Sequence, residues 1–88
     1  MSLKELRVQI DTINRKLIEL LGTRLEVARE IARVKKKERL PILDAKREDA
    51  IKAEIRMLAK EQGLSPTVME EIFTIVMDYT RLEMEAVQ

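Results

Sequence analysis

The sequence predicts an all-α domain of three helices, the first much longer than the other two. Apolar residues recur at three- and four-residue spacing along most of the chain, and proline-containing stretches near residues 41 and 66 divide it into three segments. Hydrophobic residues make up 45% of the chain and aromatic residues only 2%, a balance typical of packed helices. We interpret residues 1–88 as a single helical domain.

The first predicted helix begins almost at once and continues to about Lys37. Ser2, followed three residues later by Glu5, fits a capping box. Such a helix would be roughly 50 Å long, which exceeds the diameter of a globule of this mass. We therefore expect part of it to pack on a second copy of the chain. Two seven-residue series define its seam: Leu3, Ile10, Leu17, Arg24 and Ile31, and Leu6, Ile13, Leu20, Val27 and Val34.

Two shorter helices are predicted to follow. Pro41 closes the first helical region, Asp44 is a suitable N-cap for the second helix, and Gly63 is a plausible residue to end it. Ser65 and Pro66 supply an N-cap and a first-turn proline for a third helix that runs close to the C-terminus. The positions of this helix that we predict to face inward are Met69, Phe73, Val76, Thr80, Glu83 and Val87.

Composition argues against several classes of function. The chain has no cysteine and no histidine, which removes disulfides, thiolate nucleophiles, imidazole bases and the usual zinc ligands. We expect no metal and no cofactor. Its net charge of +1 and the near absence of stacking aromatics argue against nucleic-acid binding. Because no signal core or membrane-spanning run is visible, we expect a soluble cytoplasmic protein without a membrane partner.

Cations interrupt the apolar stripe of the first helix. Arg24 occupies the seam itself, and Arg7 and Lys35 flank it. Burying a cation costs free energy unless an anion pairs with it. Arg24 and Lys35 point the same way with about 16 Å between their backbones, whereas Arg7 is about 25 Å from Arg24. Arg24 and Lys35 could hold one small molecule, and Arg7 could join them only from another chain. Two first helices crossing antiparallel near residue 18 would place Arg7 between Arg24 and Lys35 of the partner.

Each candidate also has an ordinary structural interpretation. Arg7 and Lys35 could be surface cations with their stems along the apolar stripe, and Arg24 could form a structural ion pair. The other candidates have similar alternatives: an N-cap for Asp44, surface charge for Arg47 and Glu48, a bond to its own helix for Thr80, an ion pair for Glu83 and apolar packing for Met84.

Five stretches of the chain form a recognisable ordered set. They are Leu6-Arg7 with Ile10 and Ile13, Leu20 to Arg24, Ala32 to Lys35, Pro41 to Glu48, and Glu71 to Phe73 leading to Thr80. Their order resembles the all-helical, AroQ-type chorismate mutases over nearly the whole chain. The resemblance implies an intertwined homodimer, with the long first helices packed antiparallel and each site borrowing an arginine from the partner. It also implies an isomerase that rearranges chorismate to prephenate in phenylalanine and tyrosine biosynthesis.

The resemblance also implies roles at matching positions. Arg24, with Arg7 from the partner chain, would clamp carboxylates, and Lys35 would bind the ether oxygen. The remaining roles would be acceptance of the ring hydroxyl by Glu48 and the backbone at Asp44, and completion of the polar wall by Arg47 and Thr80.

One position departs from the family pattern. Four residues after the Ser or Thr, the family usually has Gln or Glu as a second donor to the ether oxygen, but this chain has Met84. A thioether cannot donate a hydrogen bond. Either Lys35 works without this donor or a protonated Glu83 replaces it. Two other functions remain open: an isochorismate pyruvate-lyase, and a non-catalytic helical dimerisation or regulatory module.

Overall fold

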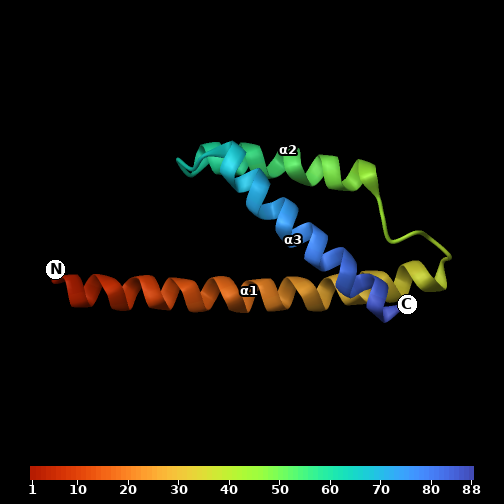
Figure 1. Cartoon of the computed structure of the whole chain (residues 1–88), viewed down its shortest axis with the longest axis horizontal. Helices are drawn as coiled ribbons and strands as arrows, with labels where there is room; N and C mark the ends of the chain where they lie inside the picture. Colours follow the sequence, from red (N-terminus) through yellow and green to blue (C-terminus); the bar gives the residue numbers. More distant parts are fainter.

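The computed structural model describes all 88 residues as three helices joined by two connections (Figure 1). Helix α1 spans Leu3–Lys37, α2 spans Ala45–Glu61 and α3 spans Pro66–Val87. The predicted all-α class, the number of helices and their order are confirmed. None of the three helices combines the length and the apolar character that crossing a bilayer requires.

Local capping explains where the helices begin and end. The side chains of Ser2, Asp44 and Ser65 each accept a hydrogen bond from the backbone amide three residues later, at 3.1, 3.0 and 3.2 Å. Gly63 follows the end of α2 with a φ of 71°, a left-handed conformation that favours glycine. The caps predicted from the sequence are therefore the caps that the structure uses.

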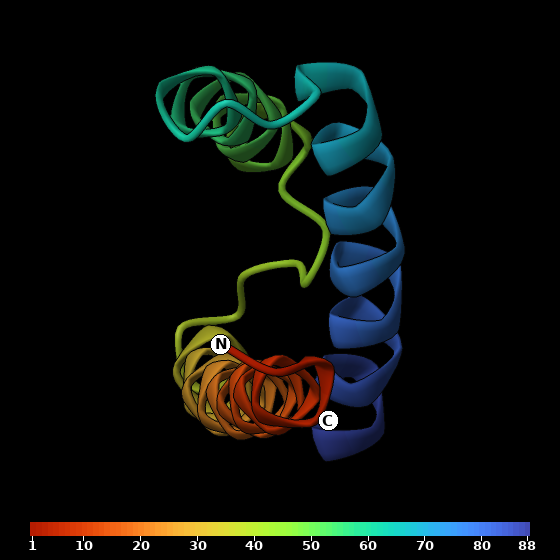
Figure 2. The ribbon, with the colours of Figure 1, turned by 90° about the vertical axis from the view of Figure 1, so that its left-hand side faces the viewer.

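Helix α3 holds the fold together because it packs against both other helices, whereas α1 and α2 do not contact each other. In Figure 1, α3 runs diagonally from the end of α2 to the C-terminal half of α1. Figure 2 shows α1 and α2 end-on at opposite ends of α3, with the 38–44 connection bridging the open side. The fold thus consists of two separated helices, α1 and α2, that both pack on α3.

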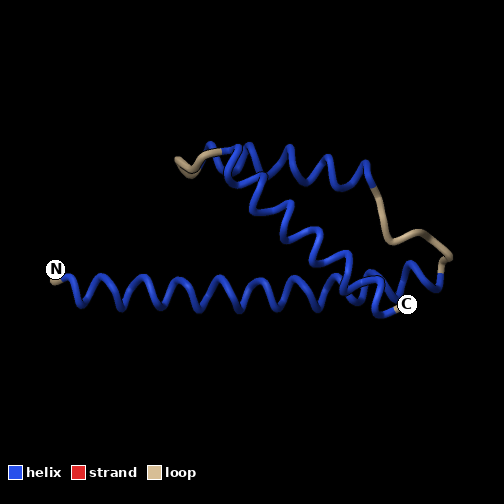
Figure 3. Tube along the Cα trace, viewed as in Figure 1, coloured by secondary structure: helices blue, strands red, loops and turns tan.

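The N-terminal end of α1 extends beyond the rest of the molecule (Figure 3). Every residue from 1 to 23 is exposed. The radius of gyration is 16.1 Å, compared with about 12 Å for a compact domain of this length. The apolar residues of the predicted seam are at least 46% exposed along the whole helix. Within one chain, the seam is therefore not covered.

The buried faces differ from those predicted. In α1 the buried residues are Ala28 and Ala32, one step around from the seam. In α3 the buried residues are Met77, Thr80 and Met84, whereas Glu83 is only half-buried. Small alanines on α1 let α3 approach closely, so Met84 packs on both of them. The predicted inward series of α3 is buried at Thr80 and half-buried at its other members, and the packing of α3 also buries Met77 and Met84, which lie outside that series.

Candidate active site

A cavity of about 400 Å³ lies between the three helices, a volume within the range of small-molecule sites. It combines an apolar lining with charged groups from both separated helices. Its lining residues are Arg24, Val27, Ala28, Ile31 and Lys35 of α1, Ile42 and Asp44 of the connection, Arg47, Glu48 and Ile51 of α2, and Met77, Thr80, Arg81 and Met84 of α3.

The structure brings most of the predicted site residues together at this cavity. Arg24 and Lys35 come from α1, as their spacing suggested, and the partners predicted for them come from other elements. The candidates in the lining are Arg24, Lys35, Asp44, Arg47, Glu48, Thr80 and Met84. Two candidates lie outside it, namely Arg7 and Glu83.

Arg24 is fixed by a contact between α1 and α3. Its Nη1 donates a 2.9 Å hydrogen bond to the hydroxyl of Thr80, which donates in turn to the carbonyl of Val76 at 2.7 Å. The back-bond considered for Thr80 is present, and the same hydroxyl also holds the guanidinium. Arginine has five N–H donors, so the bond to Thr80 leaves others to face a ligand.

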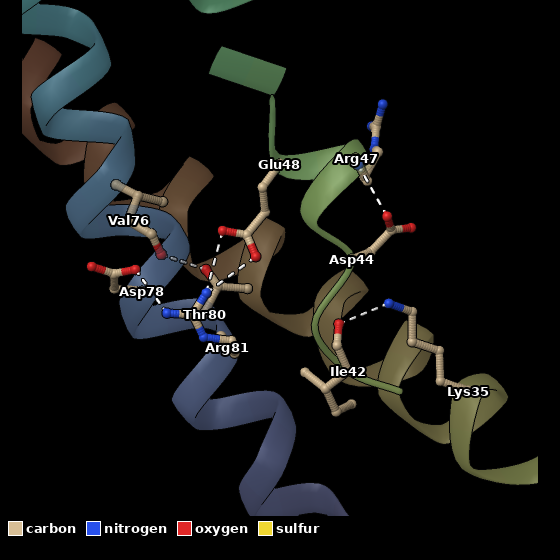
Figure 4. Close-up of polar contacts among 9 residues, drawn as sticks. All are labelled: Lys35, Ile42, Asp44, Arg47, Glu48, Val76, Asp78, Thr80 and Arg81. Atoms are coloured by element: carbon tan, nitrogen blue, oxygen red, sulfur yellow. Dashed lines mark hydrogen bonds and ion pairs between the residues drawn. The ribbon is translucent and has the colours of Figure 1, made fainter. Parts of the chain in front are cut away.

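Lys35 is fixed by the connection after α1. Its ammonium donates a 2.9 Å hydrogen bond to the carbonyl of Ile42, and Figure 4 shows this bond joining α1 to the connection that leads to Asp44. An ammonium has three donors, which leaves two for a ligand. Asp44 uses one carboxylate oxygen to cap α2, so its side chain serves the helix that carries Arg47 and Glu48.

Glu48 faces an arginine that the sequence analysis did not identify. Nη1 of Arg81 contacts both carboxylate oxygens of Glu48, at 3.1 and 3.3 Å, and Nη2 contacts Asp78 at 3.0 Å (Figure 4). The charge of Glu48, with a smaller contribution from Asp78, raises the pKa of Arg81 above its usual value, against a smaller lowering by desolvation. Arg81 lies three residues before Met84 on α3, so helical spacing could have placed it on the cavity. Its pairing with Glu48 depends on how the helices cross.

Arg47 and Met84 show two different environments in the lining. Arg47 is exposed, and its side chain extends away from the Glu48 and Arg81 pair in Figure 4. Met84 is only 9% exposed and packs against the α1 alanines. The position expected to carry a second donor is therefore at the cavity, and it presents a thioether.

The two remaining candidates are placed elsewhere. Arg7 lies on the exposed N-terminal half of α1, so it does not reach the cavity of its own chain. The carboxylate of Glu83 pairs with Arg29 of α1 at 3.0 Å, outside the cavity lining. The ion pair considered for Glu83 is the arrangement that the structure shows.

The charge of the cavity matches a doubly anionic ligand. Arg24, Lys35, Arg47 and Arg81 line the cavity together with two acidic residues, Asp44 and Glu48, which leaves an excess of two positive charges. The lining offers no His or Cys, and its hydroxyl, on Thr80, is held between Arg24 and Val76. This arrangement is suited to binding and polarising a small dicarboxylate and is poorly suited to nucleophilic chemistry.

Comparison with known proteins identifies the class to which this fold and site belong. The family model for chorismate mutase type II matches residues 6–85. The chain therefore belongs to the chorismate mutase type II family, an assignment that confirms the resemblance found in the sequence.

Individual relatives agree with this assignment. The chorismate mutase of Methanocaldococcus jannaschii is 33% identical over 79 residues, which cover 90% of this chain and 80% of that protein. A T-protein of Haemophilus influenzae is 37% identical over 71 residues, 81% of this chain but 19% of that protein. A bifunctional chorismate mutase/prephenate dehydratase of Aquifex aeolicus is 42% identical over 59 residues, 67% of this chain and 16% of that protein. The chain thus spans less than a fifth of these two longer relatives.

Proposed function

We propose that this chain is a chorismate mutase, an isomerase that converts chorismate to prephenate by a Claisen rearrangement. The observation that carries the proposal is the cavity with an excess of two positive charges, built from α1, α2 and α3. Chorismate is a dicarboxylate with one ether oxygen and one ring hydroxyl, so its two negative charges match this excess. Membership of the chorismate mutase type II family supports the same substrate.

The reaction suits a site without a nucleophile, metal or obligatory proton transfer. The bond from the ether oxygen to the ring breaks as a new carbon–carbon bond forms within the same molecule. The protein has to hold the enolpyruvyl group folded over the ring and to stabilise the negative charge that grows on the ether oxygen. Arg24, held by Thr80, would bind a carboxylate, and Lys35, held by the Ile42 carbonyl, would donate to the ether oxygen.

The second wall of the cavity would bind the ring. Glu48 and the backbone at Asp44 would receive the ring hydroxyl, and Arg47 would turn toward the ring carboxylate. Met84 would contact the substrate through its thioether, which leaves Lys35 as the principal donor to the ether oxygen. Because Glu83 is engaged by Arg29, we assign it no part in the reaction.

We also propose that the working form is an intertwined homodimer. The support is the apolar seam of α1, whose residues Leu3, Ile10 and Leu17 are 64%, 56% and 54% exposed in the single chain. An exposed apolar surface of this extent marks an interaction site. An antiparallel pair of α1 helices would cover it and would bring Arg7 of each chain to the cavity of the other.

The decisive experiment offers the purified protein chorismate and isochorismate separately and identifies the products. Prephenate from chorismate supports the proposal. Release of pyruvate from isochorismate without prephenate formation would instead indicate a lyase, an alternative that stays open because Met84 departs from the family pattern. If neither compound is turned over, the chain is a non-catalytic helical module and the proposal fails.

A further inference from the structure

Arg81 is the charged residue of the cavity that the proposed reaction leaves without a role. It lines the same cavity as Arg24 and Lys35, and its guanidinium joins α3 to Glu48 of α2. The Arg81 and Glu48 side chains are 30% and 25% exposed, so the pair lies at the wall of the cavity and is partly screened from water. An ion pair elsewhere on the surface would say nothing about ligand binding, but this pair lies where a ligand would bind.

The chemistry of the ligand restricts what Glu48 can do. An ionised carboxylate only accepts hydrogen bonds, and the proposed substrate has one donor, its ring hydroxyl. Its two carboxylates and its ether oxygen would be repelled by Glu48. Glu48 is therefore compatible with the substrate only where the hydroxyl meets it.

Arg81 offsets the negative charge of that carboxylate and restricts its rotation. Its Nη1 reaches both oxygens of Glu48, and its Nη2 is held by Asp78, so the carboxylate is fixed against α3. The pair is neutral as a whole, which reduces the repulsion that Glu48 alone would exert on a dianion. A glutamate free to rotate could follow a hydroxyl at another ring position, whereas a fixed glutamate cannot.

We infer that Arg81 is a positioning residue that acts through Glu48 and makes the site selective for the position of the ring hydroxyl. The inference rests on the proposed function. It predicts preference for chorismate over isochorismate, which carries the same carboxylates and ether but has its hydroxyl at another ring position. Arg81 itself need not touch the substrate.

The test compares five proteins in one assay: wild type, Arg81→Gln, Arg81→Lys, Glu48→Gln and the double variant of Arg81→Gln with Glu48→Gln. For each, kcat and KM are measured with chorismate, and the inhibition constant of isochorismate is measured as a competing ligand. Arg56→Gln is the matched control, because Arg56 also pairs across α2 and α3, with Glu70 at 3.7 Å, but does not line the cavity. Helical content and oligomeric state are checked for every protein.

We expect Arg81→Gln to reduce the preference for chorismate over isochorismate by about tenfold or more, the scale of one charge-assisted hydrogen bond. Glu48→Gln should reduce it by a similar factor, and the double variant should lose no more than Glu48→Gln alone. Arg81→Lys should recover part of the preference, since an ammonium keeps the charge but lacks the planar fork. Arg56→Gln should leave the preference unchanged.

Other outcomes overturn the inference. Equal weakening of both ligands by Arg81→Gln would mean that the arginine has only a structural role. Losses that multiply in the double variant would mean that Arg81 binds the ligand directly. If Arg81→Gln does not fold, Arg81→Lys and Glu48→Gln decide, because a wild-type preference in both refutes the inference.

The wild-type result separates failure of the proposed function from failure of the inference. If the wild-type protein neither binds nor converts chorismate, the proposed function is refuted, and the inference with it. If the wild type converts chorismate and Arg81→Gln keeps the wild-type preference, only the inference is refuted.

Discussion

Arg24 of α1 and Thr80 of α3 are joined by a 2.9 Å hydrogen bond across the junction of the two helices that carry most of the cavity. The threonine hydroxyl is fixed by its own bond to Val76, so it presents a lone pair to the arginine. The guanidinium is therefore positioned before any ligand arrives, which lowers the cost of binding.

Replacing Thr80 by valine tests this relationship, because valine keeps the shape and removes the acceptor. We expect kcat/KM for chorismate to fall by roughly tenfold to a hundredfold, the effect of an unpaired, partly buried donor. Thr80→Ser keeps the hydroxyl and should stay within a few-fold of wild type. Steady-state kinetics of the three proteins decide the matter, and equal rates for Thr80→Val and wild type would show that Arg24 is oriented by other groups.

Subunit mixing tests whether Arg7 completes the cavity of the partner. Arg7→Ala and Arg24→Ala should each be nearly inactive as homodimers. Random exchange makes half of the dimers mixed, each with one intact site of two, so activity should recover to about a quarter of wild type. Exchange is followed independently with differently tagged chains. Complete exchange without recovery would contradict the shared site.

The exposed seam of α1 predicts which surface substitution disrupts the assembly. Leu17→Glu changes a side chain that is 54% exposed in the single chain, so an isolated chain would tolerate it. If two α1 helices bury this position, the unpaired charge should dissociate the dimer and abolish activity. Met57→Glu is the control, because Met57 is 66% exposed on α2. Sedimentation analysis gives the readout, and an unchanged molecular mass for Leu17→Glu would refute the seam as an interface.

The thioether of Met84 predicts a variant that is faster than wild type. Met84→Gln would add a donor at the cavity, and one donor to a developing oxyanion is worth about 2.7 to 4 kcal/mol in comparable sites. We expect kcat to rise by about tenfold or more, somewhat below that range because Met84 also packs on α1.

Two controls accompany Met84→Gln. Met77→Gln changes another buried methionine of the same cavity wall and should not raise kcat. Glu83→Gln should leave both the rate and its pH profile unchanged, because Glu83 is engaged by Arg29. A loss of activity in Glu83→Gln, with no gain in Met84→Gln, would restore Glu83 as the second donor.

The environment of Arg81 predicts the pH dependence of stability. Glu48 raises the pKa of Arg81, so the folded chain holds this proton more tightly than the unfolded chain. The stabilisation is complete below the ordinary pKa of arginine and is lost only as the pH rises through the raised value. The difference in denaturation midpoint between wild type and Arg81→Gln should therefore not decline between pH 7 and pH 11. In Arg81→Lys the corresponding difference should decline as the pH passes about 10.4, the ordinary pKa of lysine. A wild-type difference that falls over the same range would contradict this assignment.

The extent to which the sequence predicts this structure depends on how local each feature is. Helix boundaries at Ser2, Asp44, Gly63 and Ser65 were predictable because each depends on groups a few residues apart. The convergence of most site residues was predictable because the distance between residues on one straight helix follows from its rise per residue, and because the order of residues resembles a known family. These are properties of one helix or of an ordered set of motifs.

Features that depend on helix crossing were not predictable. The inward series of α3 left out the buried Met77 and Met84 because apolar spacing made two adjacent faces nearly equivalent. Ala28 and Ala32 on α1 provide the surface on which Met84 packs. Arg81 was missed for the same reason, since its partner Glu48 is 33 residues away. The seam of α1 was recognised as apolar, but a sequence pattern does not say which chain covers it.

The absence of contact between α1 and α2 has a mechanical consequence. Arg24 and Lys35 belong to α1, and Arg47 and Glu48 belong to α2. A ligand bound by both sets would therefore connect two helices that do not otherwise touch. Binding would then link two helices that otherwise pack only on α3, and it would stabilise the folded chain by an amount that grows with the ligand concentration relative to its Kd. Amide hydrogen exchange at the start of α2 would slow when the ligand is bound.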